Sequence, residues 1–245
     1  KSTLMNAFVG ERLSIITSKA QTTRHRILGV VNGEDFQVVF SDTPGIIKPA
    51  YELQSSMMNF VKSAFEDADI LLYMVEVGEQ ELKDESFFNR IILANIPVLL
   101  LLNKIDTTNQ EMLEEHLDYW RSKVPNAEIY PISAINYFNV REVFDRIVQL
   151  LPECPPYYPK DTLTDKPERF FVNEIIREKI LLHYKKEIPY SVEVVTEEFF
   201  EDEDIIRIRS VIMVERDTQK GIIIGHKGVA LKKVGTDARA DLEQF

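Results

Sequence analysis

The sequence predicts an α/β domain with a mostly parallel sheet and helices on both faces, followed by a smaller α+β domain. Short apolar runs alternate with amphipathic stretches through residues 1–151, as strands and helices do in such sheets. Prolines then cluster at 152, 155, 156 and 159, where neither a helix nor a central strand can continue. We therefore expect a Pro-rich linker, 152–168, between a first domain, 1–151, and a second, 169–245.

In the first domain, apolar patterns predict each element in turn. Two apolar runs flank the turn pair Asn32-Gly33, which predicts an antiparallel hairpin. Continuous apolar runs predict buried strands, and apolar residues at helical spacing predict the helices between them. The hairpin strands are 26–31 and 36–41, the further strands are 70–77, 98–103 and 128–132, and the helices are 53–65, 82–93, 111–120 and 140–151.

The second domain has a different order of elements. A helix is expected first, then a strand, an acidic loop, a longer strand and two helices on either side of the sequence GHKG. These elements cover 169–184, 190–196, 197–204 and 205–216, with GHKG at 225–228. The order is helix, strand, strand, helix, helix.

Composition limits the classes of function. The longest apolar runs are much shorter than the ~20 residues that span a bilayer, so we expect buried strands and no membrane helix. The single cysteine, Cys154, excludes an internal disulfide and suits a reducing, cytoplasmic setting. The net charge is −11, yet residues 218–236 contain no acidic residue and four lysines. Binding of nucleic acid therefore depends on local patches.

Two motifs point to phosphate. Lys1, Ser2 and Thr3 fit the tail of the pattern GxxxxGK[ST], whose glycines we expect before residue 1. Alone, this tripeptide is better explained as a helix cap. Asp42 and Gly45 belong to the sequence DTPG at a strand end, where a carboxylate can lie beside Mg²⁺ and a glycine admits a phosphate. An ordinary turn explains DTPG equally well.

The clearest motif follows a buried strand. Asn103, Lys104 and Asp106 form NKxD. The carboxylate of this motif can accept hydrogen bonds from the N–H groups of guanine, whereas adenine offers no matching donors. Ser133 and Ala134 end the next strand, where the N–H of Ala134 can reach the guanine carbonyl oxygen. Each motif alone also fits a solvated loop or a helix start. Their fixed order at strand ends predicts a guanine-nucleotide site.

These motifs make residues 1 to about 151 resemble the P-loop GTPase family. The resemblance implies GTP or GDP with Mg²⁺ as cofactors, and a switch that changes state on hydrolysis. The nucleotide-binding residues that it implies are Lys1, Ser2, Thr3, Asp42, Gly45, Asn103, Lys104, Asp106, Ser133 and Ala134.

The resemblance also assigns metal and catalytic roles. It implies that Ser2, Thr23 and Asp42 hold Mg²⁺, with Thr22 as a close alternative to Thr23, and that Lys1 and Thr23 act in catalysis. Many of these GTPases have a glutamine directly after the glycine of DTPG, but this chain has Ile46. An apolar side chain cannot position water, so we expect slow basal hydrolysis.

The second domain offers a track for nucleic acid. Two glycines let a phosphate backbone approach, lysines supply charge, and the following helix presents its N-terminus. A helix-turn-helix joint with solvated lysines is the plainer explanation of GxxG alone. With the order of elements around it, the motif resembles a type II KH domain, whose final strand we expect to be missing after Phe245. The RNA-binding residues are Gly225, His226, Lys227, Gly228, Lys232 and Lys233.

Together, the two domains resemble the Era family of bacterial GTPases. Residues 19–26 and 174–179 carry this resemblance besides the motifs above. It implies binding of the 3′ end of 16S ribosomal RNA and of the 30S subunit, a role in small-subunit maturation, and peripheral contact with the inner membrane. We expect a cytoplasmic monomer that does not bind DNA. The alternatives are an RNA-binding module with a mainly structural GTP site, and another ribosome-assembly GTPase with a KH-like tail.

Overall fold

The structure, a computed structural model, describes residues 1–17, 19, 22–80 and 85–245. The chain forms two compact units, and each unit takes residues from two stretches of sequence. The first unit holds Lys1–Glu11 and Thr23–Asp165, and the second holds Arg12–Thr22 and Lys166–Phe245.

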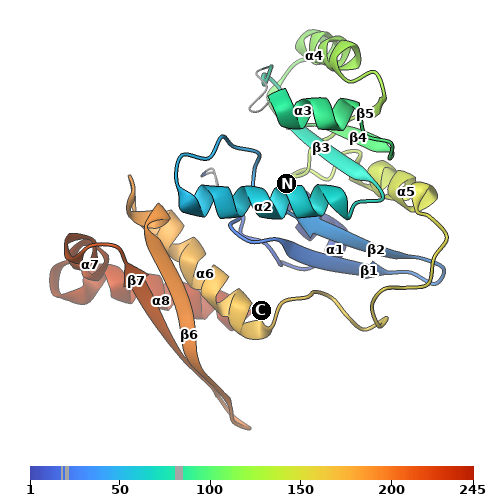
Figure 1. The fold of residues 1–245 in the computed structure, drawn as a ribbon. Coiled ribbons are helices and arrows are strands. Elements are labelled where there is room, and N and C mark those ends of the chain that lie inside the picture. The colour runs from blue at the N-terminus through green and yellow to red at the C-terminus, as the bar shows by residue number, and fades with distance from the viewer. Residues whose placement is uncertain (18, 20–21, 81–84) are drawn as a thin grey trace. The chain divides into compact units, whose positions relative to one another are not determined.

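The strands of the first unit form two sheets (Figure 1). Strands β1 and β2 pair antiparallel, as predicted for the hairpin. Strands β3, β4 and β5 lie in that order and run parallel, which confirms the predicted α/β fold. The bounds are β1 Ile27–Asn32, β2 Gln37–Asp42, β3 Leu71–Glu76, β4 Val98–Asn103 and β5 Ala127–Pro131.

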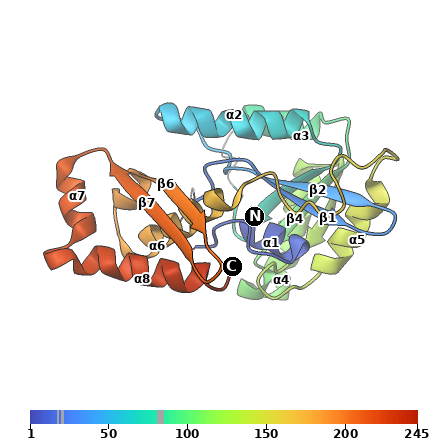
Figure 2. The ribbon, with the colours of Figure 1, turned by 90° about the horizontal axis from the view of Figure 1, so that it is seen from below.

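Helices cover both sides of these strands. Figure 2 shows α2 and α3 on one side and α1 on the other. Trp120 of α4 joins residues of α2, α3 and β4 in one apolar cluster. The predicted helix 82–93 is observed from Glu85, and residues 82–84 lie outside the described part of the chain. The helices are α1 Ser2–Val9, α2 Glu52–Glu66, α3 Glu85–Ile92, α4 Gln110–Lys123 and α5 Val140–Leu150, with a 3₁₀ turn at Ile105–Thr107.

Strand β4 is buried along its whole length. Its edges pair with β3 and β5, and Leu100, Leu101 and Leu102 are 0% exposed. A continuous apolar run suits a strand that has no face toward water. Asn103 ends this run and is also buried, so the first polar side chain of the strand is fixed in place by the core beneath it.

Part of the Pro-rich segment that we expect to be a linker lies along the β1–β2 hairpin. The Gln37 side chain accepts a hydrogen bond from the N–H of Tyr157 over 2.8 Å. The N–H of Val30 donates to the carbonyl oxygen of Leu163 over 2.8 Å. These bonds, which lie far apart in sequence, tie this stretch to the first unit up to Asp165.

The second unit has the predicted order helix, strand, strand, helix, helix. Val192 and Val194 of its antiparallel hairpin pack in an apolar cluster with Ile180 and Val234. In the described residues, no helix of either unit combines the length and apolar character needed to cross a membrane. The elements are α6 Glu168–His183, β6 Val192–Glu201, β7 Ile206–Val214, α7 Asp217–Ile224 and α8 Val229–Leu242, with 3₁₀ turns at Ile188–Tyr190 and His226–Gly228.

The predicted acidic loop, 197–204, is wrong in its first half. Strand β6 continues to Glu201, after a bulge between Thr196 and Glu198. The paired strand explains why this acidic sequence stays extended, because Arg209 of β7 pairs with Glu198 across the hairpin at 2.9 Å. Such cross-strand charge pairs offset the low strand propensity of glutamate.

Charged side chains hold the stretch Arg12–Thr22 to the helices of the second unit. Arg12 pairs with Glu178 of α6 and, over 2.9 Å, with Asp241 of α8. Lys179 also contacts Asp241. Burial alone would raise the pKa of the Asp241 carboxyl, but hydrogen bonds from Lys179 and Arg12 outweigh it, so the pKa is lowered.

Further bonds follow along the same stretch. Lys19 donates to the carbonyl oxygens of Leu181 and, over 2.5 Å, of Tyr184 at the end of α6. Arg177 donates to the carbonyl oxygen of Thr22 over 2.6 Å. These contacts make Arg12–Thr22 a structural part of the second unit, although it lies more than a hundred residues earlier in the sequence.

We expect Asp241→Asn to lower the free energy of unfolding of the second unit by about 1–2 kcal/mol at neutral pH, because a neutral amide loses two charge-assisted bonds. A lowered folded-state pKa contributes stability above the unfolded pKa, and this stability is lost as pH falls through the folded pKa. The difference from the parent should therefore shrink in acid, as measured by urea unfolding. Glu243→Gln, which removes the exposed partner of Arg239, is the control and should cost under about 0.5 kcal/mol. A difference that stays constant in acid would contradict the assignment.

Candidate functional site

The three predicted metal ligands lie together near the carboxyl end of β2. The Ser2 hydroxyl donates to Asp42 Oδ2 over 2.7 Å, and Ser2 Oγ lies 3.2 Å from Thr23 Oγ1. Asp42 and Thr23 are both buried. Two hydroxyls and a carboxylate are hard oxygen donors, which Mg²⁺ prefers, so these side chains fit a magnesium ion.

The geometry separates the two candidate threonines. The Thr23 hydroxyl lies beside Ser2 in the first unit, whereas the Thr22 carbonyl oxygen bonds to Arg177 in the second. This arrangement favours Thr23 as the metal ligand. Ala20 and Gln21, from the same motif, lie outside the described residues.

The predicted phosphate-binding residues surround the same strand end. The Lys1 ammonium donates to the carbonyl oxygen of Thr43 over 2.6 Å, one residue beyond the aspartate of the metal cluster. Thr3 is half-buried in the first turn of α1. A Cβ added at Gly45 would meet no atom within 4 Å, so the backbone there is open to a ligand. A lysine charge and an accessible backbone suit a nucleotide's terminal phosphates.

Two hydrogen bonds join the loops that follow β4 and β5. Asn103 Oδ1 accepts the N–H of Ala134 over 3.0 Å in a buried bond, so Asn103 engages the donor that the sequence analysis offered to the guanine carbonyl oxygen. Asp106 Oδ1 accepts the Ser133 hydroxyl over 2.5 Å. Asp106 is itself exposed, so its second carboxylate oxygen can accept from a ligand. The structure thus brings all four residues together around one acceptor that faces solvent.

Lys104 lies in the same loop with left-handed backbone angles, φ 66° and ψ 34°. Its Nζ lies 2.7 Å from Glu76 Oε2 at the end of β3. Glu76 was missed in the sequence because it belongs to no motif. The parallel register pairs Glu76 with Asn103, so a carboxylate at the end of the neighbouring strand was the available signal.

Ile46 packs against the apolar cluster that contains Met58 and Val61 of α2. A hydrocarbon side chain in this position offers water no hydrogen bond. The side chain directly after Gly45 therefore cannot orient an attacking water, as the sequence indicated.

Four of the predicted RNA-binding residues form the turn between α7 and α8, and the other two, Lys232 and Lys233, lie on α8. Gly225 and Gly228 have positive φ angles of 70° and 76°. A Cβ at Gly225 would lie 2.7 Å from the Cβ of Ala230, so a larger residue cannot fit without a shift of α8. The basic side chains of this region are exposed; they are His226, Lys227, Lys232 and Lys233.

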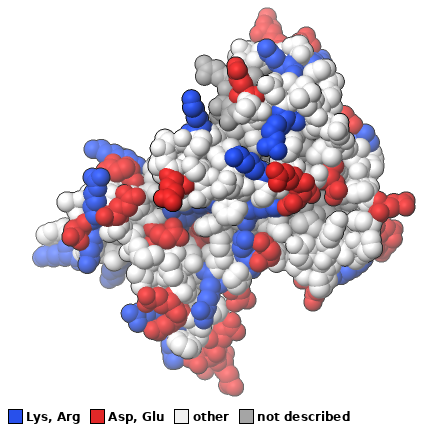
Figure 3. All heavy atoms as spheres, in the orientation of Figure 1, with Lys and Arg blue, Asp and Glu red and all other residues white. Residues whose placement is uncertain are grey.

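Charge on the surface is mixed. On the face seen in Figure 3, basic and acidic side chains are interspersed rather than gathered into one large patch. With a net charge of −11, the chain as a whole does not attract a polyanion. Any contact with nucleic acid must therefore be local, as at the glycine turn.

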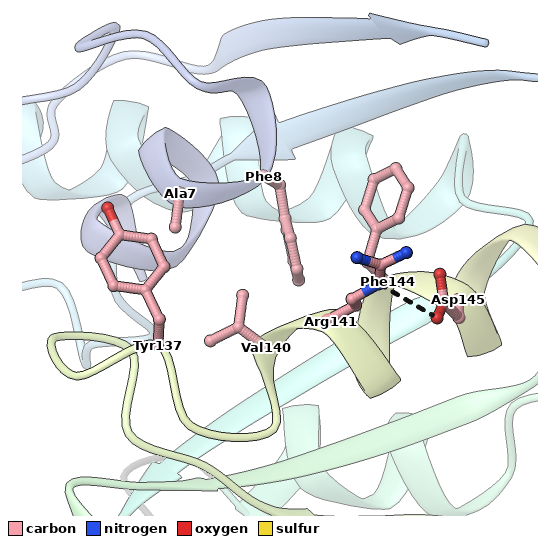
Figure 4. A pocket seen from close by; sticks show the side chains of 7 residues that line it. All are labelled: Ala7, Phe8, Tyr137, Val140, Arg141, Phe144 and Asp145. Atoms are coloured by element: carbon pink, nitrogen blue, oxygen red, sulfur yellow. Dashed lines mark ion pairs between the residues drawn. The ribbon is translucent and has the colours of Figure 1, made fainter.

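A pocket of about 390 Å³ opens between α1 and α5 (Figure 4). The rings of Phe8 and Phe144 line it with centroids 5.6 Å apart, and Arg141 approaches Asp145 to 3.8 Å. None of the predicted nucleotide-binding residues lines this pocket, so it is separate from the candidate site. The lining residues are Ala7, Phe8, Tyr137, Val140, Arg141, Phe144 and Asp145.

Comparison with protein families gives two matches. Residues 1–104 match the family described as 50S ribosome-binding GTPase. Residues 187–245 match the KH domain family. The two matches fall on the two halves of the chain in which the sequence predicted a nucleotide site and a GxxG turn.

Individual relatives match over nearly the whole chain. GTPase Era of Syntrophus aciditrophicus is 46% identical over 248 residues, which cover 100% of this chain and 81% of that protein. Two solved structures share 38% identity and a TM-score of 0.93, covering 99% of this chain and 84% of theirs. One is a variant of Aquifex aeolicus Era bound to GDP·AlF4⁻. The other is Era in complex with MgGDPNP and nucleotides 1506–1542 of 16S ribosomal RNA.

We expect Asn103→Ala to lower the free energy of unfolding of the first unit by about 1–3 kcal/mol, because the buried N–H of Ala134 loses its acceptor. Urea unfolding measures this difference. Asn59→Ala, at an exposed position on α2, is the matched control and should stay within about 0.5 kcal/mol of the parent. Equal stability of the two variants would mean that the bond between the loops contributes nothing.

Proposed function

This chain belongs to the Era family of GTPases, and from that premise we propose that its GTP state controls binding of the 3′ end of 16S ribosomal RNA during assembly of the small ribosomal subunit. It binds GTP and GDP with Mg²⁺ and hydrolyses GTP. The observation that carries the proposed switch is the Ser2, Thr23 and Asp42 cluster, in which a loop threonine meets a helix start and a strand end.

The nucleotide would be held at three places. Lys1 and the open backbone at Gly45 would face the terminal phosphates, and Asp106 would accept the N–H groups of guanine. A bound Mg²⁺, with Ser2 and Asp42 among its ligands, would supply positive charge that offsets the charge of the phosphates. Thr23 would complete that ligand set only while a terminal phosphate is present, and would be released after hydrolysis.

Hydrolysis needs a group to orient water, and Ile46 cannot be that group. We therefore expect the isolated protein to hydrolyse GTP slowly. A backbone group, another side chain or a bound partner would supply the missing contact. A slow intrinsic rate suits a switch, because the GTP state then lasts until a partner arrives.

RNA would bind at the turn between α7 and α8. A Cβ added at Gly228 would meet no atom within 4 Å, so the backbone there is open, and Lys227 and His226 are exposed beside it. Lys232 and Lys233 follow on α8, whose N-terminus begins at this turn. A phosphate backbone can approach such a turn closely and gain charge-assisted bonds from the lysines.

The small subunit is the better of two ribosomal partners. One matching family is described by binding to the 50S subunit, but that match ends at residue 104. The relatives that match the whole chain are Era proteins, and one was solved with 16S ribosomal RNA, which belongs to the small subunit. The KH unit beside the GTPase unit supports RNA as the partner of this chain.

We further propose, from the family resemblance alone, that the protein is a cytoplasmic monomer. On the same ground we propose that it contacts the inner membrane peripherally and does not bind DNA. A second candidate function, an RNA-binding module whose GTP site is mainly structural, is favoured by Ile46 and by nothing else described above.

RNA affinity should depend on the nucleotide. We expect the protein to bind an RNA of 16S 3′-end sequence about tenfold more tightly with a non-hydrolysable GTP analogue than with GDP, as measured by fluorescence anisotropy. Thr23→Ala should bring this ratio close to one, because the loop then loses its ligand to the GTP state. Ser122→Ala, an exposed hydroxyl on α4, should leave the ratio unchanged. Equal RNA affinity of the parent with both nucleotides would favour the structural GTP site instead.

The glycine turn should carry RNA binding without nucleotide binding. We expect the double variant His226→Asp and Lys227→Asp to weaken RNA binding by about tenfold or more, because two acidic groups repel phosphate. Affinity for GDP should stay within about threefold of the parent. Lys185→Asp, at another exposed lysine of the second unit, serves as control. Loss of RNA and GDP binding together would indicate misfolding, and full RNA binding would place the RNA elsewhere.

A further inference from the structure

The last residue of β3 and the two residues after it contact the loop that carries NKxD and helix α4. The Glu76 side chain pairs with Lys104, Nζ to Oε2, over 2.7 Å. The N–H of Val77 donates to the carbonyl oxygen of Asn103 over 3.0 Å. The N–H of Gly78 donates to His116 Nε2 over 3.1 Å. Each of these three residues therefore bonds to the loop that carries NKxD or to the helix behind it.

The pair of Glu76 and Lys104 fixes a side chain that is otherwise free to turn. About half of each side chain is exposed, 54% for Glu76 and 50% for Lys104. An isolated pair of this kind contributes little to folding. It does restrict the rotamers of a long lysine side chain whose backbone is already held in the left-handed region. The Lys104 side chain therefore loses its conformational entropy before a nucleotide binds, and this preorganisation raises the affinity for the nucleotide.

His116 holds the turn after β3 from α4. It is 6% exposed, and its Nε2 accepts the Gly78 N–H, so a neutral ring carries its proton on Nδ1. That Nδ1 has no hydrogen-bond partner in the described part of the chain. A leucine at this position would have no unpaired buried nitrogen, but it would leave the Gly78 N–H without its acceptor. The choice of histidine is explained by the turn that it supports.

From these contacts we infer that Glu76 is a positioning residue for guanine-nucleotide binding, acting through Lys104, and that His116 fixes the turn that follows Glu76. The inference rests on the guanine site proposed above. Neither residue lies at the metal cluster, so both should affect GDP and GTP equally.

Glu76→Ala in the full-length protein should raise the Kd for a fluorescent GDP by about threefold to fivefold, mainly through faster release. The same fold-change is expected for the GTP analogue. Lys104→Ala should also weaken binding, and adding Glu76→Ala to it should change Kd less than about twofold, because the pair acts as a unit. Asp118→Ala, which breaks the exposed pair with Arg121 on α4, is the matched control and should match the parent.

Three results separate the possible failures. If Lys104→Ala binds GDP normally, the proposed guanine site is wrong. If Lys104→Ala weakens binding while Glu76→Ala does not, or if their effects simply add, only the role of Glu76 is wrong. Should Glu76→Ala unfold at a lower temperature than the parent, Glu76→Gln, which keeps the size and removes the charge, is measured in its place with the same criteria.

The role of His116 is tested by comparing a variant that removes its hydrogen-bond acceptor with one that restores an acceptor. His116→Leu should raise the Kd for GDP by about threefold to tenfold, because the turn loses its anchor. His116→Gln, whose amide oxygen can accept the Gly78 N–H, should restore most of the affinity. In the Lys104→Ala background, His116→Leu should have little further effect on Kd. A leucine variant with parent affinity, or a glutamine variant as weak as leucine, would remove His116 from the proposal.

Discussion

The candidate nucleotide site depends on one buried hydrogen bond, from the N–H of Ala134 to the side chain of Asn103. A backbone N–H in the core needs a partner, and here the partner comes from the end of the neighbouring strand. Asn103 cannot move, because the fully buried leucines before it fix the end of β4. The core therefore sets the spacing between the two loops. That spacing in turn sets the positions of Asp106 and Ser133, which are joined by a hydrogen bond across the loops.

Much of this site could be predicted because its signals are local. The run of leucines ending in Asn103 predicted both the strand and its end, and the structure gives the same bounds, Val98–Asn103. The carboxyl ends of parallel strands meet at one edge, so motifs at those ends were expected to converge. The grouping of Ser2, Thr23 and Asp42 was implied by the family resemblance and not by strand ends, because Ser2 opens a helix and Thr23 lies in a loop. The structure lays the Thr23 hydroxyl beside Ser2, which favours it over Thr22.

The remaining features depend on contacts between distant residues. No motif marks Glu76, and its place beside the NKxD loop depends on the strand register, which pairs it with Asn103. No sequence pattern distinguishes His116 from other residues of α4. Its role follows from the hydrogen bond that it accepts from the Gly78 N–H, which only the structure shows. The extension of β6 through acidic residues likewise depends on the arginines of β7. Local propensity predicted a loop there, and the partner strand overrode it.

The division of the chain between its units limits how the protein can be dissected. The second unit contains Arg12–Thr22, so a fragment that begins at Lys166 would lack a piece of its own structure. Glu178 and Asp241 would lose Arg12, and the end of α6 would lose the lysine that binds its carbonyl groups. A KH fragment that begins after the linker would therefore lack contacts that stabilise the second unit in the intact protein. The chain passes from the second unit to the first between Thr22 and Thr23, so a fragment that keeps both pieces of the second unit must also carry the first-unit sequence between them.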